Sequence, residues 1–308
     1  MGIRVKFIVI LVIAAIVPLG IALVAIWTVG ARHYQEEKGT SFQQTAAHLA
    51  QRLDLVLDKQ IEGFSDWVQL SPLRDRLAEI NSKLPELSSA EFNARVQIIE
   101  AQWPKLTPQA PELQAVLTND IARELRAFQT ACPLFAEILV TDRLGQLVAA
   151  TGKTSDYLQS DEAWWQQAFP MPAGRAHVEG VAYDESAGVY SVDVAIPVRH
   201  IRHPKDKPVG VIKGVVNASP LFASARASLR EDRARHLIVM DDGRILAAMT
   251  GSAVEPLQER LPVAVMERIK GRRAGWIAAS LNGITQLIGF APLHETRHLK
   301  GETIITGL

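Results

Sequence analysis

The sequence has very little cysteine and no imbalance of charge. Cys132 is the only cysteine among 308 residues, so the chain can form neither an intrachain disulfide nor a cysteine-rich metal site. Lys and Arg together number 33, as do Asp and Glu, and this balance does not favour nucleic acid as a partner. A Gly-rich phosphate loop, a Gly-x-Ser-x-Gly motif and a convincing catalytic set are also missing. We therefore expect neither an enzyme nor a cofactor.

Charge is absent altogether from one long stretch, Phe7 to Gly30. As a helix with a rise of ~1.5 Å per residue, this stretch is long enough to cross a hydrocarbon core of roughly 30 Å. Arg4 and Lys6 precede it, which predicts a cytoplasmic N-terminus and export of the rest of the chain. The alternative is a signal peptide cleaved near Val29-Gly30-Ala31, but the stretch exceeds the usual apolar region of about 7–15 residues. We expect a single-pass anchor in the cytoplasmic membrane with the bulk of the chain outside, in the periplasm.

Apolar residues recur in steps of three and four from Phe42 to Val68, which predicts one long amphipathic helix. Two interpretations stay open: the helix packs on its own domain, or it forms a stalk that pairs with a second copy. A second stripe, from Leu113 to Phe128, predicts a further helix whose apolar face belongs to the core.

Two segments repeat the same pattern about a hundred residues apart. In Ile138–Ala150, two apolar runs flank Asp142-Arg143-Leu144-Gly145, a turn in which Gly145 can take positive φ, and this predicts a β-hairpin. Leu237–Gly251 has the same order of apolar run, Asp, Gly, polar residue and second apolar run. The repetition predicts two similar modules in tandem.

Further strands and helices complete each module. Alternating runs flank the turn at Asp184–Gly188, and a helix follows the next strand. The predicted strands are 177–183, 189–196, 209–216, 275–280, 285–290 and 303–308, and the predicted helices are 220–229 and 263–269.

This organisation resembles the double Cache family of bacterial extracytoplasmic sensors, over about Tyr34 to Leu308. The most specific segments are DRLGQLVAATGKTSDYLQSDEAWW, YDESAGVYSVDVAIPV and PVGVIKGVVNASPLF. The resemblance implies an α+β fold with two PAS-like antiparallel sheets, a ligand pocket in the membrane-distal module and signalling as a homodimer. It also implies a second membrane helix leading to a chemoreceptor, kinase or cyclic-dinucleotide output domain. Since this chain contains neither, we expect a receptor fragment.

The expected organisation divides the chain into five parts. A cytoplasmic N-terminus (1–6) and a transmembrane helix (7–30) precede a helical stalk and helical region (31–132). The membrane-distal Cache module (133–229) and an incomplete membrane-proximal module (230–308) follow.

Aromatic and acidic residues cluster in the predicted membrane-distal module. Aromatic walls with a few carboxylates suit a small polar or cationic ligand, through cation–π contacts and charge-assisted hydrogen bonds. The alternative is that the tryptophans belong to the core or cover a loop and the acids cap helices. The candidate ligand-binding residues are Tyr157, Asp161, Glu162, Trp164, Trp165, Tyr183, Asp184, Tyr190 and Asp193.

In amino-acid receptors of this family, which the chain resembles, a Tyr and then an Arg precede the tryptophan and hold the ligand carboxylate. Tyr157, Trp164 and Trp165 match that pattern, but Glu162 stands where the arginine would hold a ligand carboxylate. The substitution predicts amines or neutral polar solutes as ligands in preference to simple carboxylates.

Two other functions compete with a sensor. His294-Glu295-Thr296-Arg297-His298 matches H-E-x-x-H, the signature of zinc proteases, and an exported zinc hydrolase is the alternative it suggests. Pro292 before the motif and Gly301 after it favour an exposed loop instead. The third possibility is a membrane-anchored structural module without a ligand.

Overall fold

The computed structural model of the chain describes residues 2–70, 72–84, 88–172, 175–199, 207–226, 234–248, 257–281, 283–293 and 302–307. These residues belong to two compact units, each built around one antiparallel sheet. The larger unit contains residues 49–232 and 293–302, and the smaller unit contains residues 1–48, 233–292 and 303–308.

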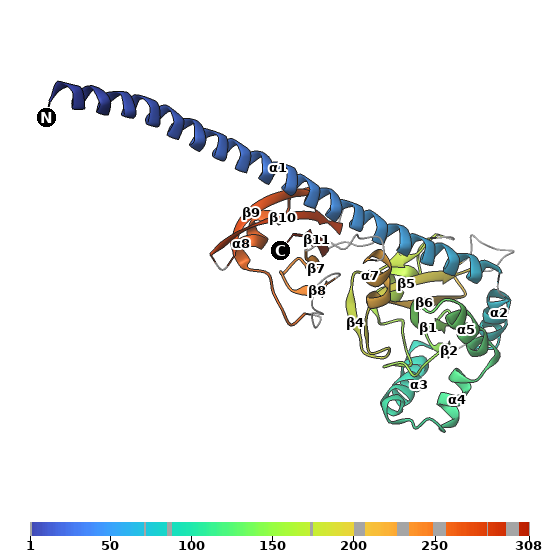
Figure 1. Ribbon diagram of the computed structural model, residues 1–308. Helices are drawn as coiled ribbons and strands as arrows, with labels where there is room; N and C mark the ends of the chain where they lie inside the picture. The colour runs from blue at the N-terminus through green and yellow to red at the C-terminus, as the bar shows by residue number, and fades with distance from the viewer. Residues whose placement is uncertain are drawn as a thin grey trace. The chain divides into compact units, whose positions relative to one another are not determined.

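Helix α1 runs without interruption from Ile3 to Leu70, through Pro18, Gly39 and Gly63 (Figure 1). It contains the only described segment long and apolar enough to cross a membrane. Its residues up to His48 belong to the smaller unit and those from Leu49 onward to the larger one. The long helix predicted after the apolar stretch is confirmed as part of this single element.

The apolar stripe of α1 packs against its own chain. Phe42 and Val56 are half-buried. The other members lie about one helical turn apart and are almost completely buried, so they contribute to the core. They are Ala46, Leu49, Leu53, Leu57, Ile61, Phe64 and Val68. Of the two interpretations of this stripe, the structure directly supports packing on the chain's own domain.

The sheet of the larger unit has the strand order β2-β1-β6-β5-β3, with β4 paired to β5. The predicted strand over 177–183 is two short strands, and the pairing with β5 shifts by one residue between Val178 and Ala182. The strands are β1 (Phe135–Thr141), β2 (Leu147–Ala150), β3 (His177–Val178), β4 (Ala182–Asp184), β5 (Val189–Val198) and β6 (Gly210–Asn217).

The helical stripe from Leu113 to Phe128 proves to be two helices. The break lies at Asn119, whose side-chain oxygen accepts a hydrogen bond from the Ala122 N–H at 2.8 Å and thereby caps the second helix. The amide nitrogen of Asn119 also donates to the Val148 carbonyl of β2. The helices are α2 (Leu73–Ser82), α3 (Ser89–Gln102), α4 (Pro111–Leu117), α5 (Asp120–Ala131), α6 (Ala163–Ala168) and α7 (Ala218–Arg226), with a 3₁₀ turn η1 (Trp103–Lys105).

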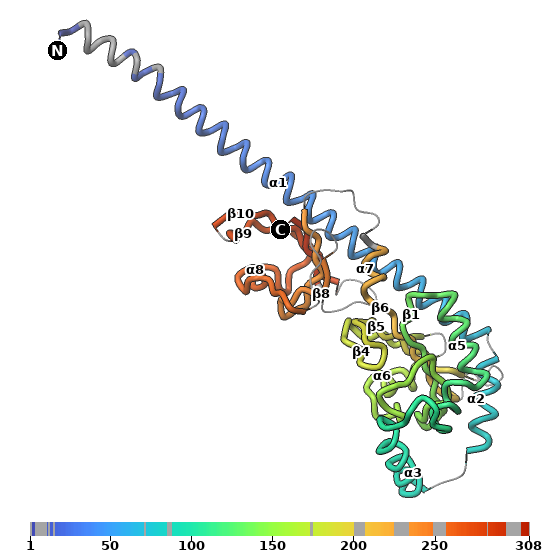
Figure 2. The backbone as a smooth tube through the Cα atoms, turned by 60° about the horizontal axis from the view of Figure 1, so that its bottom comes forward, coloured from blue at the N-terminus to red at the C-terminus, as the bar shows by residue number. Residues whose placement is uncertain are grey.

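One face of this sheet packs against α1 and α5, which lie side by side in Figures 1 and 2. The Phe135 ring at the start of β1 lies 4.9 Å from that of Phe64 on α1 and 5.5 Å from that of Phe128 on α5. Gly214 of β6 lies beneath these rings, where a Cβ atom would come within 2.6 Å of Phe135. This close contact explains the glycine in the middle of a buried strand.

An irregularity in β1 places Phe135 and Glu137 on opposite faces of the sheet. The pairing of β1 with β6 shifts between Phe135 and Glu137, so these two residues face opposite sides although regular alternation would place them on one. Glu137 therefore faces the side covered by α4 and α6. Tryptophans 103, 164 and 165 belong to the hydrophobic core on this side.

The smaller unit repeats the same design. Its sheet has the order β8-β7-β11-β10-β9, which matches the order of the larger sheet strand for strand when β4 is set aside. Gly145 and Gly243 both have positive φ, 83° and 86°, as the two hairpins predict. The elements are β7 (His236–Met240), β8 (Ile245–Ala248), α8 (Val263–Ile269), β9 (Gly275–Leu281), β10 (Ile284–Pro292) and β11 (Glu302–Thr306). The α+β fold with two tandem antiparallel modules is confirmed.

Candidate functional site

Buried polar side chains are concentrated in the larger unit. In the smaller unit the described ones are His236 and Thr306, which contact each other at 3.0 Å. The described residues of the larger unit include eight: Glu137, Thr141, Asp142, Gln146, Thr154, Gln159, Ser191 and Lys213. Since burying a charge is costly unless it is paired, this asymmetry favours a functional site in the larger unit.

Lys213 is the centre of a charged cluster on the face of the sheet covered by α6. Its ammonium nitrogen lies 2.7 Å from Oδ2 of Asp193 on β5 and 3.3 Å from Oδ2 of Asp184 on β4. The same nitrogen lies 5.4 Å from the centre of the Trp164 ring, a cation–π distance. Burial alone would lower the pKa of Lys213, but the two carboxylates outweigh it and the pKa is raised. The Lys213 side chain is therefore charged at neutral pH.

Glu137 lies on the same face and is only 3% exposed. Its Oε2 accepts a hydrogen bond of 2.6 Å from the Ser186 hydroxyl, whereas its Oε1 is buried with no hydrogen-bond partner among the described residues. Burial is the main reason why the pKa of Glu137 rises to about 6, and the nearby Asp184 adds to it.

The Ser186 hydroxyl also lies 2.8 Å from Oδ1 of Asp184. A hydroxyl has one proton to donate, so it cannot satisfy two ionised carboxylates at once. Protonated Glu137 would resolve this conflict by donating to Ser186, which then donates to Asp184. The hydrogen bonds and the raised pKa thus agree on which carboxyl is protonated more readily.

The cluster has more carboxylates than cations. Glu137, Asp184 and Asp193 surround a single described ammonium group, so the site has a net negative charge when all are ionised. The unpartnered Oε1 of Glu137 can accept a hydrogen bond from an ammonium, amide or hydroxyl group of a small molecule.

Four of the sequence-predicted residues lie at or near this cluster. Trp164, Asp184 and Asp193 contact Lys213, as described above. Glu162, at the N-cap of α6, is half-buried and makes no side-chain cap hydrogen bond. Its pKa is raised by burial first and by the neighbouring acids second, while Lys213 acts in the opposite direction.

The structure places the other predicted residues elsewhere. Trp165 belongs to the core, where its indole N–H donates to the Thr141 hydroxyl at 2.9 Å, and Asp161 is exposed. Tyr183 pairs with Tyr190 in the β4–β5 ladder, one residue out of phase with Asp184 and Ser191, so both tyrosines face away from the cluster.

Tyr157 lies in a different environment from the charged cluster. It lines a cavity of about 420 Å³, and its ring centre is 5.3 Å from that of Trp103. Burial raises the pKa of its hydroxyl, and the nearby Asp142 adds to this shift. The Tyr157 hydroxyl is therefore neutral at physiological pH.

Two members of the cluster, Lys213 and Glu137, are not among the sequence-predicted residues. Each is a single charged residue inside an otherwise apolar strand, in VGVIKGVV and in FAEILV. A charge in such a run is the signal that could have identified them, because buried strands rarely contain unpaired charges.

A zinc site is not visible in the part of the chain that the structure describes, where no group of three or more His, Cys, Asp or Glu side chains could hold a metal. The motif residues His294, Glu295 and His298 lie outside the described residues.

Two solved structures with a similar fold are ligand-binding domains of chemoreceptors. No protein-family model and no curated protein sequence matches the chain. The ligand-binding domain of the Campylobacter jejuni chemoreceptor Tlp3, in complex with 4-methylisoleucine, is 13% identical, covers 87% of this chain and 91% of its own, and has a TM-score of 0.53.

The ligand-binding domain of the Pseudomonas aeruginosa amino acid chemoreceptor PctB, in complex with L-Arg, is 16% identical. The match covers 88% of this chain and 95% of that one, with a TM-score of 0.50. At these identities the similarity establishes the fold, and it confirms the Cache-type architecture that the sequence predicts.

Proposed function

We propose that this chain is the ligand-sensing region of a bacterial membrane receptor. The apolar start of α1 anchors it in the cytoplasmic membrane as a single span, and both sheet units lie on the extracytoplasmic side. The fold shared with chemoreceptor ligand-binding domains and the segment of α1 that is apolar enough to span a membrane support this proposal.

The ligand is a small polar or cationic solute that binds at the charged cluster around Lys213. The single observation that carries this assignment is Glu137: a carboxyl that is 3% exposed, with one oxygen lacking a hydrogen-bond partner among the described residues. A buried acceptor without a donor destabilises a fold by about 1–3 kcal/mol, so its presence is more readily explained by binding than by stability.

The ligand class follows from the charges that surround this acceptor. The Lys213 ammonium lies at a cation–π distance from Trp164 and compensates only part of the negative charge of Glu137, Asp184 and Asp193. Glu162 adds further negative charge on the α6 side, at the position where an arginine would attract a ligand carboxylate. We therefore infer amines and neutral hydrogen-bond donors as ligands, in preference to simple carboxylates.

Calorimetry on the full chain in lipid nanodiscs tests this assignment. The panel contains ethylamine, ethanolamine, glycerol, L-arginine, acetate and lactate. At least one amine or polyol should bind, and Glu137→Met and Asp193→Asn should each weaken it by about tenfold, the equivalent of one charge-assisted hydrogen bond. Glu185→Gln, an exposed acid on the neighbouring turn, is the matched control.

Binding of acetate or lactate that competes with the bound amine or polyol, and that is unaffected by Glu162→Gln and Asp184→Asn, would contradict the charge argument. Failure of the whole panel would leave the fold assignment intact but remove the support for this ligand class.

The sensor proposal includes no covalent chemistry. The competing zinc hydrolase requires copurifying zinc, which elemental analysis of the full chain would detect and His294→Ala would abolish. Zinc bound in a one-to-one ratio would favour the hydrolase.

Dimerisation also belongs to this proposal, but it has lost one of its supports. Most of the stripe from Phe42 to Val68 is buried within the chain, so it is not a free face for a partner helix. Analytical ultracentrifugation of the full chain in detergent tests it, and a strict monomer at high concentration would overturn it.

A further inference from the structure

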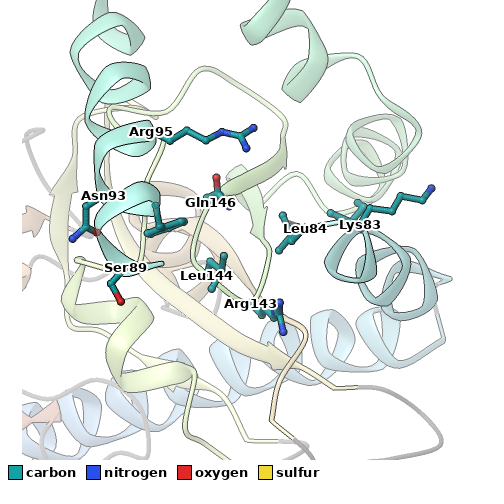
Figure 3. Close-up of a pocket in the computed structure, with 10 residues that line it drawn as sticks. Lys83, Leu84, Ser89, Asn93, Arg95, Arg143, Leu144 and Gln146 are labelled. Atoms are coloured by element: carbon teal, nitrogen blue, oxygen red, sulfur yellow. The ribbon is translucent and has the colours of Figure 1, made fainter. Parts of the chain in front are cut away.

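A cavity of about 710 Å³ lies between the end of α2, helix α3 and the turn that joins β1 to β2 (Figure 3). The 420 Å³ cavity lined by Tyr157 is its neighbour, because both are lined by Ile80, Leu84, Arg95 and Gln146. Each has a volume typical of small-molecule sites. The described lining of these two cavities includes no residue of the Lys213 cluster, so this region is separate from the site proposed above.

The larger cavity is positively charged. Lys83, Arg95 and Arg143 line it, and its described lining includes no acid. Lys83 is compensated by Glu79 at 2.5 Å, but neither Arg95 nor Arg143 forms an ion pair with a described residue. Uncompensated guanidinium groups at a cavity favour an anion, and above all a carboxylate that can accept two parallel hydrogen bonds.

The smaller cavity is mainly apolar and aromatic. Ile99, Val116 and Leu147 line it together with the Trp103–Tyr157 pair. Its lining includes two acids, Asp142 and Glu112.

Asp142 is already engaged within the β1–β2 turn. Its two oxygens accept hydrogen bonds from the Leu144 N–H and from the backbone and side chain of Gln146. Glu112, at the start of α4, is exposed and ionisable, and it would repel an anionic group placed in the smaller cavity.

Arg95 connects the two cavities. Figure 3 shows the Arg95 side chain extending from α3 above Gln146. Arg143 lies at the opposite end of the same view. The anionic end of a ligand is thus attracted to Arg95 and towards the larger cavity. The neighbouring apolar cavity is available to the rest of the molecule.

We propose that this region is a second binding site, for a small organic anion with an apolar body: a carboxylate held by Arg95, with its hydrocarbon or aromatic part against Trp103 and Tyr157. The proposal does not depend on the ligand inferred for the Lys213 cluster. It concerns different residues and the opposite ligand charge.

Calorimetry on the full chain in nanodiscs, with empty nanodiscs as the blank, tests the charge requirement. The probes are phenylacetate, its neutral analogue phenylacetamide, and decanoate, which distinguishes an aromatic acid from a fatty acid. At least one of the two acids should bind, and phenylacetamide should bind about tenfold more weakly than phenylacetate if the aromatic acid is the ligand.

Arg95→Gln should weaken acid binding by about tenfold, and Arg95→Lys should restore only part of it, because lysine keeps the charge but loses the two-pronged geometry. Arg95 is exposed on a helix surface, so both variants keep the fold. Arg52→Gln, an exposed arginine on α1 that lines neither cavity, is the matched control and should bind like the unchanged chain.

Equal binding of acid and amide, no effect of Arg95→Gln, or no binding of either acid at millimolar concentration would overturn the proposal. Crystals of the full chain soaked in 4-bromophenylacetate locate the ligand independently. A bromine signal beside Trp103 supports this site, and a signal beside Trp164 instead would assign the anion to the Lys213 cluster and overturn it.

Discussion

Replacing Glu137 by Gln should stabilise the larger unit at neutral and alkaline pH. Gln has nearly the same shape as a protonated Glu and carries no charge. Its amide group can donate to the Ser186 oxygen, which frees the serine proton for Asp184, 2.8 Å away. The variant thus reproduces permanently the hydrogen-bond pattern that Glu137 reaches only when it is protonated.

The size of the effect follows from the pKa. Burial raises the pKa of Glu137 from its ordinary 4.5 to about 6, a difference of about 1.5 pH units. One unit corresponds to about 1.36 kcal/mol, so ionised Glu137 costs the folded state roughly 2 kcal/mol. The pKa of Glu137 is higher in the folded state than in the unfolded state, so its ionisation favours unfolding. The free energy of unfolding is therefore highest below about pH 4.5 and falls as the pH rises through about 6. Glu137→Gln should remove this fall.

Urea unfolding at pH 5 and pH 8, followed by tryptophan fluorescence, measures the difference. Trp67, Trp103, Trp164 and Trp165 all belong to the larger unit and report on its transition. The variant should exceed the unchanged chain by about 2 kcal/mol at pH 8, or about 4–8 °C in Tm, and by much less at pH 5. Equal or lower stability at pH 8 would refute the account of Glu137 as an uncompensated buried carboxylate.

Three further substitutions test other parts of the larger unit. Lys213→Met leaves Asp184 and Asp193 without their shared cation, so the free energy of unfolding should fall by about 3–5 kcal/mol at pH 8 and by less at pH 5. A loss that does not depend on pH would contradict this ion pairing. Asn119→Ala removes the cap of α5 and should cost about 1 kcal/mol in urea unfolding, whereas no change would mean that the cap is dispensable. Gly145→Ala places a residue with a Cβ atom at a position of positive φ, so Tm should fall measurably. An unchanged Tm would show that the hairpin turn can relax.

Much of the fold could be predicted from the sequence because its signals are local. The hairpin turns needed a residue with positive φ, and Gly145 and Gly243 supply it. The long helix was predictable from its apolar spacing. The break at Asn119 was not, since an N-cap in the middle of a continuous apolar stripe is recognised only when the chain is seen to turn there.

The candidate site was less predictable because it depends on strand register. Tyr183 and Asp184 are adjacent in one strand and so face opposite sides of the sheet, but only the pairing of Asp184 with Val189 shows that the aspartate is the one facing the cluster. Glu137 and Lys213 are 76 positions apart, and only the alignment of β1 with β6 brings them to the same face. Long-range register is not encoded in the spacing of any single segment.

The one-residue irregularity in β1 also shortens the mechanical route between the candidate site and the long helix. Glu137 faces the polar cluster, and Phe135, two positions away, packs on Phe64 of α1. In the proposed sensor, a displacement of the backbone at Glu137 would act on α1 through a single intervening residue, Ala136, rather than through the thickness of the sheet. In the proposed sensor, the start of β1 would therefore couple the candidate site to α1, and the one extra residue in this strand makes that coupling short.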